Sequence, residues 1–271
     1  MAETATPQVR AHVYLCAVVA LILPAGPASA VVKGSPSTLA PHVVRIHAGH
    51  ACTGVAIARR MIVTARHCVR GGMRIVAGGI SIGVAGKGQS GTLDDGRNIS
   101  VTGDAAIVRL AAALPASVVP VRVGHGDQPA DGDEYIIAGY GTASEASRGA
   151  VGTLREAKLV RAEPRALVDP NRTGSIGASA CFGDSGGPVL RGGALIGIIT
   201  RAAHPHPRIA CGHLTRWAPV VASEAAETTA AAPSAETGTQ VDEPRRVNRH
   251  ATKRAALIRT DVVGYDPGRS H

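Results

Sequence analysis

Between residues 31 and 221, short apolar runs rich in β-branched residues alternate with turns that contain Gly, Asp or Pro. The whole chain of 271 residues holds 33 Gly and 17 Pro, a turn content that favours a β-rich protein over a helical bundle. Many short strands at this spacing are typical of an all-β sandwich or a pair of barrels. The predicted strands are His42–His47, Ala51–Ile57, Met61–Thr64, Met73–Ala77, Asn98–Val101, Ala105–Leu110, Tyr135–Ala138, Lys158–Arg161, Pro188–Leu190 and Ala194–Thr200.

Residues 1–30 have the order of a secretory signal peptide. A polar start with Arg10 precedes the apolar run Val13–Leu23, and small residues close the segment at Ala28-Ser29-Ala30. The apolar run is shorter than the roughly 20 residues that a membrane-spanning helix needs. We expect cleavage after Ala30, secretion, and no stable membrane insertion afterwards; an uncleaved anchor or a buried core helix is the alternative.

The C-terminal part changes composition. Ala and Glu over Trp217–Thr229 predict a short helix. Residues 222–271 form a low-complexity tail, acidic over 224–243 and basic over 245–259, which we expect to be largely disordered.

The net charge of +9 falls on residues 31–221, because residues 1–30 hold one acid and one base and residues 222–271 hold seven of each. The basic residues are spread over many turns, and aromatic residues make up only 2% of the chain. Nucleic-acid binding is therefore not expected. We expect a monomer with a basic surface.

Five cysteines are present, and Cys16 lies within the predicted signal peptide. Export would leave Cys52, Cys68, Cys181 and Cys211, which predict two disulfides with three possible connectivities. Because no Cys-x-x-Cys spacing occurs, a structural zinc site is not expected.

Three segments carry residues suited to nucleophilic catalysis. Cys181–Val189 (CFGDSGGPV) flanks Ser185 with glycines, which let a substrate approach the hydroxyl closely. Thr64–Cys68 (TARHC) places His67 at the end of a β-branched run, and in Gly103–Leu110 (GDAAIVRL) Asp104 opens an alternating strand. The nearby Asp94 and Asp95 are followed by Gly, which is typical of a turn.

Together these segments resemble the chymotrypsin/trypsin family of serine proteases, in which the triad follows the order His, Asp, Ser. The resemblance covers Val31 to about Val221, with weaker matches at Cys52–Gly54 and Gly139–Thr142. It implies a compact secreted member of bacterial type, in which a protease domain over residues 31–221 folds as two six-stranded antiparallel β-barrels.

The resemblance also implies a role for each site residue. Ser185 would be the nucleophile, His67 the general base, and Asp104 the group that orients His67. The backbone N–H groups of Gly183 and Ser185 would form the oxyanion hole, and no cofactor is required. The implied disulfides are Cys52–Cys68 and Cys181–Cys211.

In this family, a new N-terminal amine pairs with the Asp before the nucleophile, here Asp184. Cleavage after Ala30 would leave Val31-Val32-Lys33-Gly34, which is similar to the mature start of the family. The hypothesis is that removal of the signal peptide itself creates the activating amine of Val31.

By the same resemblance, the specificity pocket falls on Ser179, Ala180, Thr200, Arg201 and Ala202. Trypsin-like members carry Asp where Ser179 stands, so preference for Lys or Arg is not expected. Cleavage after apolar or small residues is expected instead. Arg66 stands where the family has a small residue, and an inward-facing side chain would place a charge beside His67.

The predicted function is that of a secreted serine endopeptidase acting on proteins or peptides through an acyl-enzyme. One alternative is a catalytically silent homologue that serves as a secreted binding protein. Another is a basic adhesion module, whose binding would be sensitive to salt and indifferent to Ser185.

Overall fold

A computed structural model of the chain describes Met1 and residues 30–125, 130, 132–147 and 152–224. These residues form strands, turns and two short 3₁₀ helices, η1 (Arg66–Cys68) and η2 (Glu145–Ser147). None of the helices among them is long and apolar enough to cross a membrane. The predicted signal peptide, Met1 and Ala30 excepted, and nearly all of the predicted tail lie outside the described residues.

One antiparallel sheet has seven strands in the order β6-β5-β2-β3-β4-β10-β7. Its central strands β3 and β4 are buried along almost their whole length, which explains their near-continuous apolar sequences. The strands are β2 (Val43–His47), β3 (Ala51–Ala58), β4 (Met61–Ala65), β5 (Arg74–Ala77), β6 (Ile80–Ile82), β7 (Val84–Gly88) and β10 (Ala105–Leu110).

The second sheet has nine strands, six of which close into a barrel. The closed order is β12-β11-β14-β15-β16-β13, and β13 pairs back with β12. These six strands are β11 (Glu134–Gly139), β12 (Arg155–Glu163), β13 (Ala166–Val168), β14 (Pro188–Arg191), β15 (Ala194–Ala203) and β16 (Leu214–Ser223). Three further strands extend the sheet: β1 (Ser35–Pro36), β8 (Ser90–Thr92) and β9 (Asn98–Val101).

The all-β prediction is confirmed, and each of the ten predicted strands matches an observed one with bounds that shift by up to three residues. Two details are wrong. Only the second sheet closes as a six-stranded barrel, whereas the first is a curled half-barrel whose end strands β6 and β7 do not pair in the described part of the chain. The helix predicted from Trp217 is also absent as far as Glu224, because β16 occupies this segment as a strand; residues 225–229 are not described.

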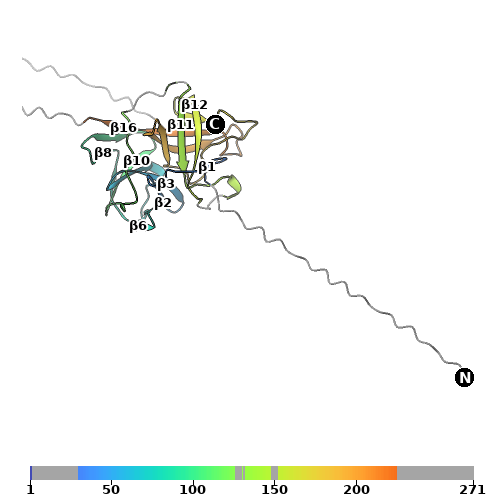
Figure 1. The fold of residues 1–271 in the computed structure, drawn as a ribbon, viewed down its shortest axis with the longest axis horizontal. Helices are drawn as coiled ribbons and strands as arrows, with labels where there is room; N and C mark the ends of the chain where they lie inside the picture. The colour runs from blue at the N-terminus through green and yellow to red at the C-terminus, as the bar shows by residue number, and fades with distance from the viewer. Residues whose placement is uncertain (2–29, 126–129, 131, 148–151, 225–271) are drawn as a thin grey trace, which may run out of the picture. The chain divides into compact units, whose positions relative to one another are not determined.

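Figure 1 shows β2, β3 and β6 grouped together and β11 and β12 on the other side of the folded unit. One apolar cluster is centred on residues of the first sheet, such as Val55 and Ile62, and extends to Leu195 and Ile198 of the second sheet. Another gathers residues such as Tyr135 and Ile137 inside the second sheet. A cleft between the loops of the two halves holds the candidate site.

Candidate active site

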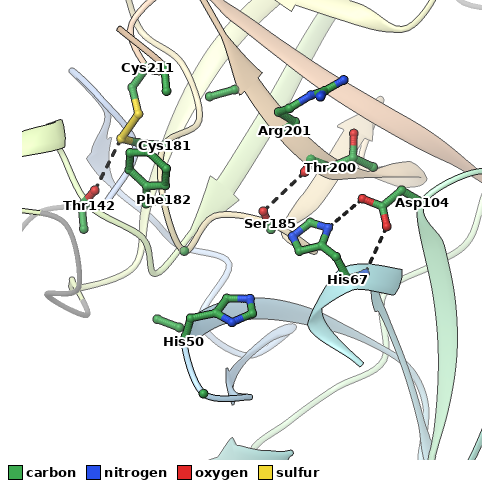
Figure 2. Close-up of a pocket in the computed structure, with 15 residues that line it drawn as sticks. His50, His67, Asp104, Thr142, Cys181, Phe182, Ser185, Thr200, Arg201 and Cys211 are labelled. Atoms are coloured by element: carbon green, nitrogen blue, oxygen red, sulfur yellow. Dashed lines mark hydrogen bonds and ion pairs between the residues drawn. A yellow bond between two sulfur atoms is a disulfide. The ribbon is translucent and has the colours of Figure 1, made fainter. Parts of the chain in front are cut away.

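The cleft has a volume of about 900 Å³ and is lined by loops and strand ends from both halves of the fold (Figure 2). It contains the side chains of all three residues of the predicted triad. The full lining is Gly49, His50, Ala51, His67, Asp104, Thr142, Cys181, Phe182, Gly183, Ser185, Thr200, Arg201, Ala202, Ala210 and Cys211.

His67 and Asp104 meet because the strands that carry them pair. β4 and β10 are antiparallel with Ala65 opposite Ala105, so the residue before β10 lies beside the turn after β4. Asp104 Oδ1 accepts the backbone N–H of His67 at 3.1 Å, and Oδ2 bonds the ring nitrogen Nδ1 at 2.7 Å. With the carboxylate as acceptor, Nδ1 carries the proton and Nε2 is left with a free lone pair.

Ser185 lies in a loop that is fixed to both halves of the fold. Its carbonyl accepts the N–H of Thr53 on β3 at 2.8 Å, and the next N–H, that of Gly186, bonds the carbonyl of Ile199 on β15 at 2.7 Å. Figure 2 shows the Ser185 side chain directed to the same part of the cleft as His67. The Ser185 hydroxyl donates to the carbonyl of Thr200 at 3.4 Å.

The turn before Ser185 presents backbone N–H groups to the cleft. Gly183 has φ +95°, and a Cβ there would lie 2.8 Å from Gly141 Cα, so the conformation requires glycine. Within the described residues, the N–H groups of Gly183 and Ser185 have no backbone or side-chain acceptor. Both N–H groups are therefore available to an anionic oxygen.

Asp184 is fully buried behind this turn. Its carboxylate accepts the backbone N–H groups of Gly141 at 2.8 Å, Cys181 at 2.9 Å, and Val31. Burial raises the pKa of this carboxyl to about 7, and the three hydrogen bonds oppose that rise. The next residue, Val32, exchanges two backbone hydrogen bonds with Ser179. The segment at which the mature protein is predicted to begin therefore lies against the site.

The structure divides the predicted specificity residues into two groups. Thr200, Arg201 and Ala202 line the cleft. Ser179 and Ala180 are fully buried and lie behind its wall instead. The Ser179 hydroxyl accepts the N–H of Gly212 at 2.7 Å and donates to the carbonyl of Ala180 at 3.0 Å, so it is engaged within the wall.

Three charged residues that lie close to His67 or Asp104 in the sequence do not line the cleft. Arg66 is exposed, so no buried charge is placed beside His67. Asp94 accepts the backbone N–H of Arg59. Asp95 pairs with the guanidinium of Arg97, which holds the pKa of that carboxyl below its usual value.

His50 lines the cleft and was not predicted from the sequence. Its ring stacks near that of His67, with centroids 6.3 Å apart and planes inclined by 12°. Partial burial, the positive charge of Arg70 and repulsion from His67 whenever that ring is protonated lower the pKa of His50. No motif surrounds this histidine in the sequence, and only the fold brings it to the site.

Cys52 pairs with Cys68, and Cys181 pairs with Cys211, as the resemblance implied. The first disulfide joins β3 to the turn that carries His67. The second joins the Ser185 loop to the segment before β16. Both therefore brace the walls of the cleft.

Comparison with known proteins supports the resemblance to serine proteases over most of the chain. The family described as Trypsin matches residues 31–221. Trypsin beta of Drosophila erecta is 29% identical over 172 residues, which is 56% of this chain and 68% of that protein. Serine protease SP24D of Anopheles gambiae is 28% identical over 183 residues, 58% of this chain and 65% of that protein. These relatives are insect proteins, and the expectation of a bacterial-type member finds no support in them.

Solved structures share the fold. Neuropsin, a serine protease expressed in the limbic system of mouse brain, superposes with a TM-score of 0.53 at 22% identity, covering 69% of this chain and 94% of neuropsin. This likeness identifies the all-β chymotrypsin fold with its closed barrel and curled half-barrel. With the family match spanning residues 31–221, the chain belongs to the trypsin family of serine proteases.

Proposed function

We propose that this protein is a secreted serine endopeptidase whose single protease domain spans residues 31–221. The observation that carries the proposal is the hydrogen bond of 2.7 Å between His67 Nδ1 and Asp104, formed in the same cleft as Ser185. A hydroxyl, an oriented imidazole and free N–H donors are the groups that acyl transfer needs.

Each group has one task in the proposed reaction. His67 Nε2 takes the proton of Ser185 Oγ as that oxygen attacks the scissile carbonyl. The N–H groups of Gly183 and Ser185 stabilise the oxyanion of the tetrahedral intermediate. The imidazolium then gives its proton to the leaving amine, and an acyl ester forms on Ser185. Water attacks this ester by the same route and frees the enzyme.

We also propose that peptides are cleaved after apolar or small residues. Among the described residues that line the cleft, Asp104, which is bonded to His67, is the one carboxylate. Ser179, where a carboxylate would attract Lys or Arg, offers only a hydroxyl that is already hydrogen-bonded. A basic substrate side chain would thus find no counter-ion there.

Release of the Val31 amine is the proposed activating step. In the chain with Ala30 attached, a peptide N–H of Val31 meets the buried Asp184 carboxylate. Cleavage after Ala30 would replace this N–H with an ammonium group, which pairs with the carboxylate far more strongly. Export and activation would then be one event.

A catalytically silent homologue is the second candidate. It is favoured by the hydroxyl of Ser185, which donates to Thr200 in this structure. In proteases without substrate, however, catalytic hydrogen bonds are often long or poorly aligned.

Hydrolysis of a peptide library by the protein that begins at Val31 tests the proposal, with Ser185→Ala as its control. We expect cleavage after apolar or small residues by the unmutated protein and none by the variant. Absence of cleavage by a folded protein would favour the silent homologue. Cleavage after Lys or Arg would contradict the proposed specificity alone.

A further inference from the structure

Four potential metal ligands lie together at one edge of the cleft. Suitable atoms of His50, Cys52, His67 and Cys68 lie within 4.8 Å of one another. The cysteines are joined in a disulfide and so offer no thiolate to a metal. The two imidazoles are therefore the ligands that the oxidised protein can supply.

His67 already has the arrangement of a metal-binding histidine. In such histidines, one ring nitrogen donates to a carboxylate, which fixes the tautomer and makes the other nitrogen more basic. Here Nδ1 of His67 bonds Asp104 at 2.7 Å. Nε2 is thereby prepared to bind either a proton or a metal ion.

His50 is placed to be the second ligand. It is exposed and belongs to the turn between β2 and β3, so its ring is not held in a packed core. Its ring centroid lies 6.3 Å from that of His67, and both rings line the cleft (Figure 2). A tetrahedral zinc ion with bonds of about 2.0–2.1 Å requires its two nitrogens to be roughly 3.4 Å apart, a distance that rotation of His50 can provide.

We propose that Zn²⁺ bridges His50 and His67 and reversibly inhibits the enzyme, an inference that rests on the proposed peptidase function. Water completes the coordination of the ion. Zinc bound to Nε2 of His67 occupies the lone pair that must take the proton of Ser185. The ion also fills the part of the cleft in which the scissile bond would lie.

Calorimetric titration of ZnCl₂ into the Ser185→Ala protein tests the site without any need for catalysis. We expect His50→Ala in that background to weaken binding by at least the 10- to 100-fold that loss of a metal site's supporting partner typically costs. His204→Ala is the matched control, because His204 and His213 form a second close pair of imidazoles, with centroids 5.6 Å apart. This control should leave the His50-dependent binding unchanged.

Peptide hydrolysis with and without ZnCl₂ then tests inhibition, each variant being compared with itself. The zinc concentration for half inhibition should rise at least about tenfold in His50→Ala and stay the same in His204→Ala. Zinc binding that is absent, or that is equally strong in His50→Ala, would overturn the site. His50-dependent binding by a protein that hydrolyses nothing would instead overturn the peptidase function and leave the site standing.

Discussion

At the scale of single residues, Asp104 uses both of its carboxylate oxygens to hold His67, one on the backbone N–H and one on the ring. An asparagine has one acceptor oxygen, so Asp104→Asn leaves one of these donors facing an NH₂ group. We expect kcat to fall by about 10⁴, because the imidazole takes the wrong tautomer. Steady-state kinetics on a peptide substrate measures this loss.

Asp95→Asn is the matched control for that variant, because Asp95 belongs to the neighbouring turn and pairs with Arg97. It should leave kcat unchanged. Equal losses in the two variants would show that Asp104 has no special part in the reaction.

Thr53 connects the Ser185 loop to both halves of the fold. Its buried hydroxyl donates to the carbonyl of Gly183 at 2.9 Å and accepts the N–H of Tyr140 at 3.1 Å. Thr53→Val leaves both backbone groups unpaired and should lower the free energy of unfolding by about 1–3 kcal/mol. Urea unfolding measures this change.

Thr53→Ser keeps the hydroxyl and is the control. It should retain most of the stability that Thr53→Val loses. If the valine and serine variants unfold at the same urea concentration, the hydrogen bonds of Thr53 contribute nothing.

The sequence predicted the residues of the site that stand in motifs. His67, Asp104 and Ser185 each lie in a distinctive segment, and the structure brings their side chains into one cleft. His50 could not be predicted, because its place beside His67 depends on the pairing of β3 with β4. The orientation of Ser179 depends likewise on the N–H of Gly212, 33 residues away.

At the scale of elements, β15 packs so closely on β16 that Gly197 has no room for a side chain. A Cβ at this position would lie 2.3 Å from the Trp217 ring and 2.6 Å from the carbonyl of Ala218. Gly197→Ala should therefore destabilise the protein by about 1–3 kcal/mol or more, as overpacking does. The melting temperature of the variant measures the effect.

Gly86→Ala in β7 is the control, since a Cβ there meets nothing within 4 Å. Its melting temperature should be close to that of the unmutated protein. A Gly197 variant that melts no lower than this control would contradict the close packing of β15 on β16.

Strand β16 shows why composition misleads about an element. Ala and Glu after Trp217 favour a helix, yet Thr215, Val220 and Val221 are β-branched, and buried and half-buried positions largely alternate along the strand. Pro219, which would break a helix interior, is placed opposite Gly197 in the sheet. Short strands such as β6 and β8 were missed because three residues carry too little periodicity to detect.

At the scale of the whole molecule, the N-terminus and Asp184 link processing to pH dependence. With Ala30 attached, the pKa of Asp184 is raised to about 7, whereas in the unfolded chain it is near 3.9. The folded state thus holds an extra proton between these values, and its stability falls as pH rises toward and through 7. Unfolding should release up to about one proton in this range.

Urea unfolding from pH 5 to 8 isolates this effect. It measures the difference in the free energy of unfolding between the unprocessed chain and its Asp184→Asn variant at each pH. The unmutated chain should lose stability relative to the variant as pH rises. The same pair of proteins beginning at Val31 should not show this loss, because an ammonium group favours the charged carboxylate. Identical pH profiles for the two lengths of chain would contradict the proposed ion pair.

If Ser185 is an activated nucleophile, it should react with an active-serine phosphonate. We expect one probe molecule per chain on the protein that begins at Val31, located on Ser185 by peptide mapping and absent from Ser185→Ala. A folded protein with both disulfides formed that takes up no probe, under conditions that label trypsin fully, would contradict the assignment of Ser185 as an activated nucleophile.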